Sequence, residues 1–311
     1  MGSTRNLITG GAGFLGSNLA KRLLNAGEEV ICIDNCCTGK ENNIKEFIIS
    51  NKFKFLKQDV IEPVDLEIDK IWHLACPASP KNYQKDPIST LRTSFLGSYN
   101  MLELARKNGS KILLASTSEI YGDPKIHPQP ESYFGNVNTT GLRSCYDEGK
   151  RVAETLFADY ERTKNIDKRI IRIFNTYGPN MQRDDGRVVS NFIVQALENK
   201  DLTIYGDGRQ TRSFCYVDDL IDGMILAMNS NYKMPINIGN PREFSIIQLA
   251  KLIQKKIRSK TKIIFQDLPE DDPIQRCPDI SLAKKELGWQ AKIDLETGLD
   301  KTIKYFKSNY G

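Results

Sequence analysis

The sequence is poor in histidine and tryptophan, with two of each in 311 residues. Its seven cysteines form no Cys-x-x-Cys pair, and they form no cluster with the two histidines, His73 and His127. Structural zinc sites are recognised in a sequence by such close spacing, so we expect no metal site. The odd number of cysteines argues against a disulfide framework and indicates a reducing compartment.

The sequence also lacks long apolar segments and a strong charge of either sign. No run approaches the ~20 apolar residues of a membrane-spanning helix, and the chain passes directly from Met1 into a strand and a glycine-rich loop. We therefore expect no signal peptide, no membrane partner and a cytoplasmic protein. The 44 basic and 39 acidic residues give a net charge of +5, and the basic residues are scattered. This pattern argues against nucleic-acid binding and suits a small anionic ligand.

Short apolar segments alternate with amphipathic segments through the first half of the chain. The pattern predicts strands at residues 6–9, 30–34, 54–60, 71–75, 112–116 and 169–174, and helices at 15–24, 91–104 and 146–164. Nearly continuous apolar strands that alternate with helices are typical of a parallel sheet covered on both faces. We therefore predict an α/β fold built on a Rossmann-type, doubly wound parallel sheet.

Three glycines stand between the first predicted strand and the helix that follows it. Gly10, Gly13 and Gly16 allow a tight turn, close approach of a pyrophosphate and tight packing of the helix on the strand. A glycine triplet is weak evidence alone, because glycines also serve ordinary turns. Asp34, at the end of the second strand, can accept hydrogen bonds from the adenosine ribose and repel the extra phosphate of NADP. Together these residues predict NAD binding.

Tyr146 and Lys150 lie one helical turn apart on the same face of a predicted helix. A Tyr-x-x-x-Lys pair is frequent by chance on a helix surface. Here, however, it follows five strands of a dinucleotide-binding fold and the segment 116–118. We expect the lysine ammonium to lower the pKa of Tyr146 and to contact the nicotinamide ribose, which would make Tyr146 a general base.

The character of the sequence changes after Gly178-Pro179, where the segments become shorter and more mixed. We predict an NAD-binding Rossmann domain with the catalytic residues over 1–178. A smaller mixed α/β substrate-binding lobe is expected over 179–311, with the chain crossing back near 211–240 and helices at about 245–258, 281–288 and 295–307. Because no Gly/Ser-rich linker separates them, the two parts should pack together.

Seven further blocks carry a family pattern: 73–80 (HLACPASP), 116–124 (STSEIYGDP), 143–150 (RSCYDEGK), 172–179 (RIFNTYGP), 185–192 (DGRVVSNF), 210–214 (QTRSF) and 276–279 (RCPD). These blocks resemble the extended short-chain dehydrogenase/reductase family of nucleotide-sugar enzymes. Within that family the sequence is similar to the UDP-glucuronic acid decarboxylases, or UDP-xylose synthases. The resemblance runs from about residue 5 to residue 305.

The resemblance implies a reaction at the sugar ring. NAD takes hydride from sugar C4, carbon dioxide leaves the resulting 4-keto sugar, and protonation at C5 with return of the hydride gives UDP-xylose and regenerates NAD. The catalytic residues implied are Thr117, Glu119, Tyr146, Lys150 and Arg276. An arginine such as Arg276 suits the substrate carboxylate, because it can grip a carboxylate through two hydrogen bonds.

The resemblance and the motifs together give two sets of candidate binding residues. The cofactor set is Gly10, Gly13, Phe14, Leu15, Gly16, Asp34, Asn35, Thr38, Gly39, Asp59, Val60, Leu74, Thr93, Tyr146 and Lys150. The substrate set is Pro77, Ser79, Tyr83, Asn100, Ser118, Asn175, Arg187, Val189, Tyr205, Arg212 and Arg276. Two members stay ambiguous: Asp59 fits an adenine contact or a solvent-facing cap, and Asn100 fits a substrate contact or a helix-capping or packing role.

The sequence departs from the family pattern at a few positions. Asn180 stands where an arginine is usual, and Cys277 replaces a lysine beside Arg276. Another NAD-dependent dehydratase or epimerase of nucleotide-sugars therefore remains an alternative, although the dehydratases carry Asp-Glu where this chain has Ser118-Glu119. An inactive NAD-binding regulator is a second alternative. The resemblance also implies a homodimer, formed by the helix that carries Tyr146 and the helix around residues 92–106.

Overall fold

The computed structural model describes residues 3–267 and 275–310. Its centre is a seven-stranded sheet in the order β11-β6-β5-β4-β1-β2-β3, in which every neighbouring pair is parallel. The strands are β1 (Arg5–Thr9), β2 (Glu29–Asp34), β3 (Phe53–Lys57), β4 (Lys70–His73), β5 (Lys111–Thr117), β6 (Lys168–Ile173) and β11 (Ile236–Ile238). The predicted doubly wound parallel sheet is confirmed.

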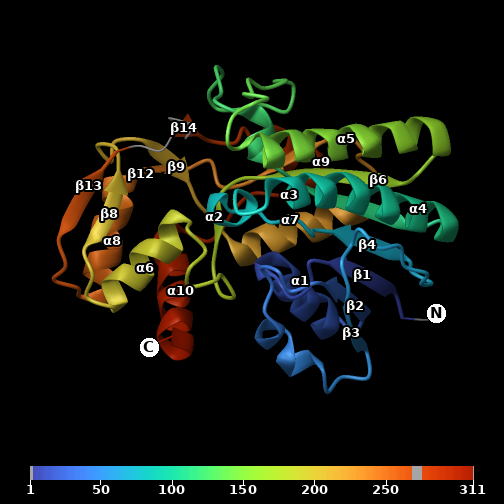
Figure 1. The fold of residues 1–311 in the computed structure, drawn as a ribbon, viewed down its shortest axis with the longest axis horizontal. Helices are drawn as coiled ribbons and strands as arrows, with labels where there is room; N and C mark the ends of the chain where they lie inside the picture. Colours follow the sequence, from blue (N-terminus) through green and yellow to red (C-terminus); the bar gives the residue numbers. More distant parts are fainter. Residues whose placement is uncertain (1–2, 268–274, 311) are drawn as a thin grey trace.

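Helices cover both faces of this sheet (Figure 1). One face packs against α1 (Phe14–Asn25) and α7 (Val217–Asn229), and the other against α4 (Ser98–Asn108) and α5 (Ser144–Lys164). Adjacent residues of one strand enter opposite layers: Ile8 and Trp72 belong to the core beneath α1 and α7, whereas Leu7 and Ile71 belong to the core beneath α4 and α5. Burial on both faces explains why these strands are apolar throughout and do not alternate with polar residues.

The remaining elements are shorter. The other helices are α2 (Pro80–Tyr83), α3 (Pro87–Arg92), α6 (Val188–Leu197), α8 (Ile246–Ile257), α9 (Ser281–Leu287) and α10 (Leu295–Tyr310), with single turns η1 (Glu41–Asn43), η2 (Lys45–Phe47), η3 (Thr93–Gly97) and η4 (Ser118–Tyr121). The small strands are β7 (Thr176–Tyr177), β8 (Leu202–Tyr205), β9 (Thr211–Ser213), β10 (Cys215–Tyr216), β12 (Glu243–Ser245), β13 (Ile263–Gln266) and β14 (Gln275–Arg276).

The second half of the chain contributes both to the small sheets and to the large sheet. β8 pairs with β13, and β9 lies between β12 and β14, in small sheets grouped with α6 and α8 at one end of the molecule (Figure 1). In between, α7 and β11 return to the large sheet, as expected for the stretch 211–240. A division into domains at residue 178 stays a prediction.

One predicted helix differs from the structure. The pattern at 91–104 predicts a single helix, but residues 87–108 form α3, then the π-helical turn η3, then α4. Such turns are frequent at functional sites, and Thr93 of η3 lines the central cavity described below. Within residues 3–267 and 275–310, no helix is long and apolar enough to cross a membrane.

Candidate active site

A cavity of about 610 Å³ lies where the carboxyl ends of the central parallel strands meet the small sheets. β1, β2, β4, β5 and β6 all end at its wall, which is the edge where doubly wound sheets bind ligands. Nearly all the candidate residues from the sequence line it. Among the described residues, the exceptions in the two candidate sets are Gly39, Tyr83 and Asn100.

The glycine-rich loop makes one end of the cavity. Gly10 has a φ of +71°, a conformation that favours glycine, and a Cβ on Gly16 would lie 2.1 Å from the Gly10 carbonyl oxygen. α1 begins directly after this loop, and its N-cap residue, Gly13, supplies no side-chain capping bond. The loop therefore brings bare backbone and the positive end of a helix to the cavity, as a pyrophosphate requires.

Asp34 is held rigidly beside this loop. Its carboxylate accepts hydrogen bonds from the Ala12 N–H at 3.0 Å and the Cys36 N–H at 2.8 Å. Burial raises the pKa of Asp34, although these backbone hydrogen bonds oppose the shift. A Cβ on Gly39 would lie 2.7 Å from the carboxylate, so Gly39 packs behind Asp34 and does not line the cavity.

Tyr146 and Lys150 lie on α5 and face the middle of the cavity. Burial raises the pKa of Tyr146 well above its usual range, although a hydrogen bond with Thr117 acts in the opposite direction. The Lys150 ammonium is 6.0 Å from the centre of the Tyr146 ring and donates a hydrogen bond to the Ala115 carbonyl oxygen at 2.9 Å. The net pKa of Tyr146 is therefore raised, opposite to the direction expected from Lys150 alone, because burial dominates.

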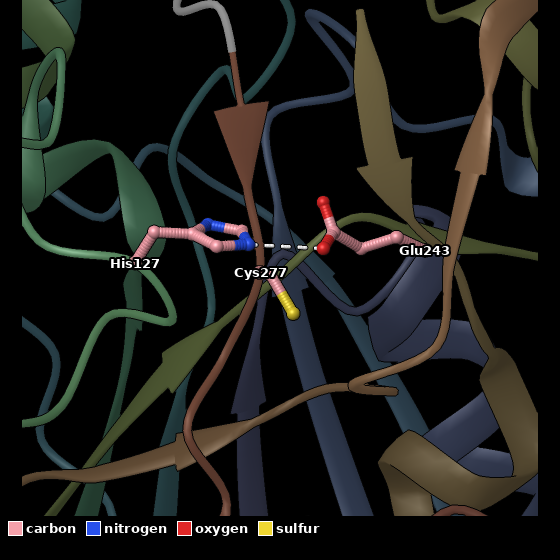
Figure 2. Close-up of side chains that lie close together, drawn as sticks. All are labelled: His127, Glu243 and Cys277. Carbon is pink, nitrogen blue, oxygen red and sulfur yellow. Dashed lines mark hydrogen bonds and ion pairs between the residues drawn. The ribbon is translucent and has the colours of Figure 1, made fainter.

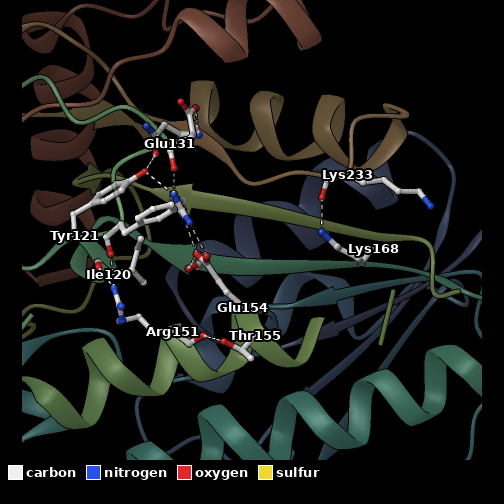
Figure 3. A network of polar contacts seen from close by, with 12 residues as sticks. Ile120, Tyr121, Glu131, Arg151, Glu154, Thr155, Lys168 and Lys233 are labelled. Carbon is white, nitrogen blue, oxygen red and sulfur yellow. Dashed lines mark hydrogen bonds and ion pairs between the residues drawn. The ribbon is translucent and has the colours of Figure 1, made fainter. Parts of the chain in front are cut away.

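A buried polar network fixes α5 against the sheet. Glu154, one turn after Lys150, accepts hydrogen bonds from Ser116 of β5 at 2.5 Å and from Arg172 of β6 at 2.8 Å. Arg172 also donates to the Tyr121 hydroxyl, so the network reaches the turn after β5 (Figure 3). The catalytic helix and the strand that ends at Thr117 are thereby joined through side chains.

At the end of the cavity where the sequence resemblance implies a sugar, Glu119 lies between two arginines. Arg143 donates to its carboxylate at 2.5 Å, and Arg276 forms an ion pair with the other carboxylate oxygen. Burial alone would raise the pKa of Glu119, but the two guanidinium groups outweigh it and lower the pKa to about 2. Glu119 therefore stays ionised across the physiological range, and the three residues together carry one net positive charge.

Asp147 is a second carboxyl group beside this cluster. It is buried, and its Oδ1 has no hydrogen-bond partner among the described residues. Burial and the negative charge of Glu119 raise the pKa of Asp147 to about 8. With Glu119, Arg143 and Arg276 it lines a smaller cavity of about 250 Å³ next to the main one. Asp147 is therefore neutral at pH 7, whereas Glu119 is charged.

The far end of the main cavity carries the residues expected to bind the nucleotide. Arg187 lies over the Phe14 ring at 5.5 Å and forms an ion pair with Asp185. Arg212 comes from β9, and Tyr205, at the end of β8, is partly exposed. These positive and aromatic side chains suit a diphosphate and a base.

Two sequence-based placements need correction, and two residues of the site, Arg143 and Asp147, were not predicted. Asn100 donates hydrogen bonds to the Val60 and Ile61 carbonyl oxygens, so it is the helix-packing residue of its two alternatives. Tyr83 is almost fully buried and stacks on the Tyr146 ring at 5.1 Å, so it supports the cavity wall from behind. Arg143 was not predicted as a site residue, although it begins the block 143–150. The sequence held no signal that this arginine would face Glu119.

Comparison with known proteins identifies the family. The model of the NAD dependent epimerase/dehydratase family matches residues 6–239. This chain belongs to that family. UDP-glucuronic acid decarboxylase 1 of Xenopus tropicalis is 52% identical over 303 residues, 97% of this chain and 72% of that protein. UDP-glucuronic acid decarboxylase 3 of Arabidopsis thaliana is 55% identical over 296 residues, 95% of this chain and 86% of that protein.

Solved structures show the same fold. UDP-glucuronic acid 4-epimerase from Bacillus cereus, crystallised in complex with UDP-glucuronic acid and NAD, superposes with a TM-score of 0.90. It is 30% identical, and the match covers 99% of this chain and all of the epimerase chain. The family resemblance inferred from the seven sequence blocks is thus confirmed by both sequence and fold.

The residues present fit NAD. A side chain on Gly16 would collide with the loop, the N-terminus of α1 faces the cavity, and the fixed carboxylate of Asp34 ends β2 where an adenosine ribose would lie. Asp59 lines the same end and accepts a hydrogen bond from Asn35 at 2.7 Å. NAD would therefore be held by the loop, Asp34 and their neighbours, with its nicotinamide toward Tyr146.

The first prediction concerns cofactor choice. We expect NAD to bind much more tightly than NADP, because the 2′-phosphate of NADP would meet the rigidly held carboxylate of Asp34. Asp34→Asn keeps the shape of the side chain and removes its negative charge, so it should reduce the difference in affinity between NAD and NADP. Titration calorimetry with both nucleotides measures this, and Cys37→Ser, at the same end of the cavity, serves as the matched control. Equal affinities of the unmodified protein for the two would contradict the assignment.

Proposed function

We propose that this chain converts UDP-glucuronic acid to UDP-xylose and carbon dioxide, with NAD regenerated in each cycle. The observation that carries the proposal is the cluster of Glu119, Arg143 and Arg276, which brings two guanidinium groups to the end of the cavity where the sugar carboxylate would lie. The decarboxylase relatives at 52% and 55% identity support the same reaction.

The residues divide the chemistry between them. Tyr146 accepts the proton of the sugar C4 hydroxyl as its phenolate, and the hydrogen bond with Thr117 and the neighbouring Lys150 ammonium would stabilise that anion against the burial that raises its pKa. NAD, when bound, would supply reversible hydride transfer at C4. A ketone there would be β to the C6 carboxylate, so carbon dioxide could leave and C5 would take up a proton before the hydride returned. Arg276 and Arg143 hold that carboxylate, and Glu119 fixes both guanidinium groups.

The other end of the substrate has its own set of residues. We propose that Arg187 and Arg212 bind the diphosphate, with Asn175 beside it, and that Tyr205 lies against the uracil. Pro77, Ser79 and Ser118 line the cavity between this end and the reacting carbons, which supports a role in sugar placement. Binding of the large UDP group then positions a small reacting sugar.

A 4-epimerase acting on the same sugar is the second candidate, because the Bacillus cereus structure resembles this chain over its whole length. Its 30% identity is well below that of the decarboxylase relatives, which favours decarboxylation. An inactive regulator is disfavoured because Thr117, Tyr146 and Lys150 are all present and line the cavity.

Product analysis separates these possibilities. Incubation with UDP-glucuronic acid and NAD should release carbon dioxide and give UDP-xylose by mass, without stoichiometric NADH. Tyr146→Phe should lower the rate by about two to four powers of ten and leave bound NAD oxidised, because the C4 proton acceptor is gone. Tyr133→Phe, a tyrosine outside the cavity, is the matched control. A product of unchanged mass would identify an epimerase, and normal turnover by Tyr146→Phe would show that another base acts.

A pH prediction follows from Asp147. Below about pH 8 the Asp147 carboxyl group is protonated, so Asp147, Glu119, Arg143 and Arg276 together carry a net charge of +1. Above about pH 8 Asp147 ionises, and the net charge of these four residues falls to zero. We expect the KM for UDP-glucuronic acid to rise between about pH 7 and about pH 9. Asp147→Asn should keep KM low throughout this range, and the inhibition constant of UDP, which lacks the carboxylate, should change little. An equal rise in KM for Asp147→Asn would exclude Asp147 as the cause.

We also propose that the protein is a homodimer. The helical segment α3–η3–α4 presents an apolar stripe at helical spacing, formed by Ile88, Leu91, Phe95 and Tyr99, with the first 74% and the others 43–44% exposed. Val152 of the neighbouring α5 is also exposed. A two-fold axis through this surface would cover both helices and bury the stripe.

The dimer prediction is tested by a charge in the stripe. Phe95→Asp should shift the mass measured by light scattering at micromolar concentration from two chains toward one, because an unpaired carboxylate would be buried at the interface. Phe134→Asp, at a loop residue that is 87% exposed, should leave the mass unchanged. A mass of one chain for the unmodified protein would overturn the proposal.

We finally propose a reducing, cytoplasmic location. All seven cysteines are free thiols, including the adjacent Cys36 and Cys37 at the surface beside the cofactor end of the cavity. Free thiols in such numbers are typical of proteins kept reduced by the cytosolic thiol pool.

A further inference from the structure

Three potential metal ligands meet on the side of the molecule formed by the small sheets (Figure 2). His127 lies in the loop after β5, Glu243 begins β12, and Cys277 follows β14. One ligand atom of each lies within 4.8 Å of the other two, and the His127 Nε2 is 2.9 Å from a Glu243 carboxylate oxygen. The three residues are more than 30 positions apart in the sequence, so no local sequence motif predicts that they form a cluster.

The surrounding backbone holds these side chains in place. Glu243 and Cys277 come from strands on opposite sides of β9, because β12 and β14 both pair with it. The Cys277 N–H donates to the side chain of Gln129, and the Gln129 N–H donates to the Cys277 carbonyl oxygen, each at 2.9 Å. These two bonds join the loop of His127 to the strand of Cys277. The site is therefore built on rigid elements.

A second layer of contacts orients the ligands. The Thr211 hydroxyl donates to the other carboxylate oxygen of Glu243 at 2.5 Å, which leaves one oxygen facing His127. The Cys277 thiol is 1% exposed and lies 3.3 Å from the Pro241 carbonyl oxygen. His127 and Glu243 are partly exposed, so water can reach the same point. Partners that orient a ligand in this way are typical of metal sites.

We propose that His127, Glu243 and Cys277 bind a Zn²⁺ ion, with water as the fourth ligand. Imidazole nitrogen, carboxylate oxygen and thiolate sulfur form a mixed set that zinc accepts, whereas Ca²⁺ and Mg²⁺ take oxygen alone. Zinc bonds of about 2.0–2.3 Å at tetrahedral angles separate ligand atoms by roughly 3.3–3.8 Å. Shifts of about 1 Å or less from the present positions produce that geometry.

Binding exchanges protons in a defined way. The Cys277 thiol loses its proton to solvent and its sulfur bonds the cation. The hydrogen bond between His127 and Glu243 is replaced by one bond from each residue to the cation, with the neutral imidazole carrying its proton on Nδ1. No oxidant or reductant takes part. This site is separate from the proposed decarboxylation, and its test does not depend on that activity.

The position of the site gives it a consequence for the main cavity. Cys277 directly follows Arg276, whose guanidinium pairs with Glu119. Adjacent residues of an extended segment point to opposite sides, so Arg276 faces the sugar end while Cys277 faces His127 and Glu243. A bound cation would therefore fix the segment that presents Arg276.

The test measures binding of the metal alone. Co²⁺ should give the near-ultraviolet absorption of a thiolate-to-cobalt charge transfer, and competition with a chromophoric chelator should give the Zn²⁺ affinity. Cys277→Ser should abolish the absorption. Thr211→Val keeps the shape of the side chain but removes its hydrogen bond to the Glu243 oxygen, so it should lower the Zn²⁺ affinity about 10–100-fold. His127→Gln should lower the Zn²⁺ affinity at least as much. Cys36→Ser/Cys37→Ser, which removes the adjacent surface thiols, should leave both signals intact.

Hydrogen exchange provides a second readout, independent of the cobalt absorption and of the chelator competition. Zn²⁺ should slow exchange of the amides of residues 275–279 in the unmodified protein, and it should have no such effect in Cys277→Ser. Absence of the charge-transfer band in the unmodified protein would overturn the proposal. So would Zn²⁺ affinity that survives Cys277→Ser but falls in Cys36→Ser/Cys37→Ser, because the adjacent thiols would then be the site.

Discussion

Glu119 is a largely buried carboxylate, 15% exposed, held between the guanidinium groups of Arg143 and Arg276, and three distant parts of the chain meet at it. Glu119 follows β5 of the large sheet, Arg143 precedes α5, and Arg276 ends β14 of a small sheet. Loss of one partner from a buried ion cluster leaves an uncompensated charge and costs about 3–5 kcal/mol. The cluster therefore joins the large sheet to a small sheet at the proposed site of the sugar, and the shape of that end of the cavity depends on it.

The same cluster sets the charge states of its neighbours. Glu119 and Asp147 are both buried carboxyl groups, yet the arginines lower the pKa of the first to about 2, whereas burial and the charge of Glu119 raise that of the second to about 8. Two acids at one site are thereby kept in opposite states at pH 7, as is common where proton transfer occurs. Glu154, bonded to Ser116 and Arg172, holds α5 in register so that Tyr146 and Asp147 keep these places.

Much of this arrangement could be predicted from the sequence, because it rests on local patterns. The apolar strands, the glycines at 10, 13 and 16, and the Tyr146–Lys150 spacing each follow from a few adjacent residues. What could not be predicted depends on packing between distant segments. Burial, and not the lysine, controls the pKa of Tyr146; Asn100 packs against the loop after β3; and Tyr83 lies behind the Tyr146 ring. The π-helical turn η3 likewise interrupts a pattern that reads as one continuous helix.

The segment 275–279 shows how one short strand can serve two sites. Arg276 reaches Glu119 on one side, and Cys277 reaches Glu243 on the other, because successive side chains of an extended backbone alternate. The sequence resemblance implies a lysine at this position, where this chain has Cys277. A lysine ammonium could pair with Glu243 but could not bind a cation, whereas a thiol can do so. The substitution therefore changes what the far side of the strand can bind while the side that presents Arg276 keeps its chemistry.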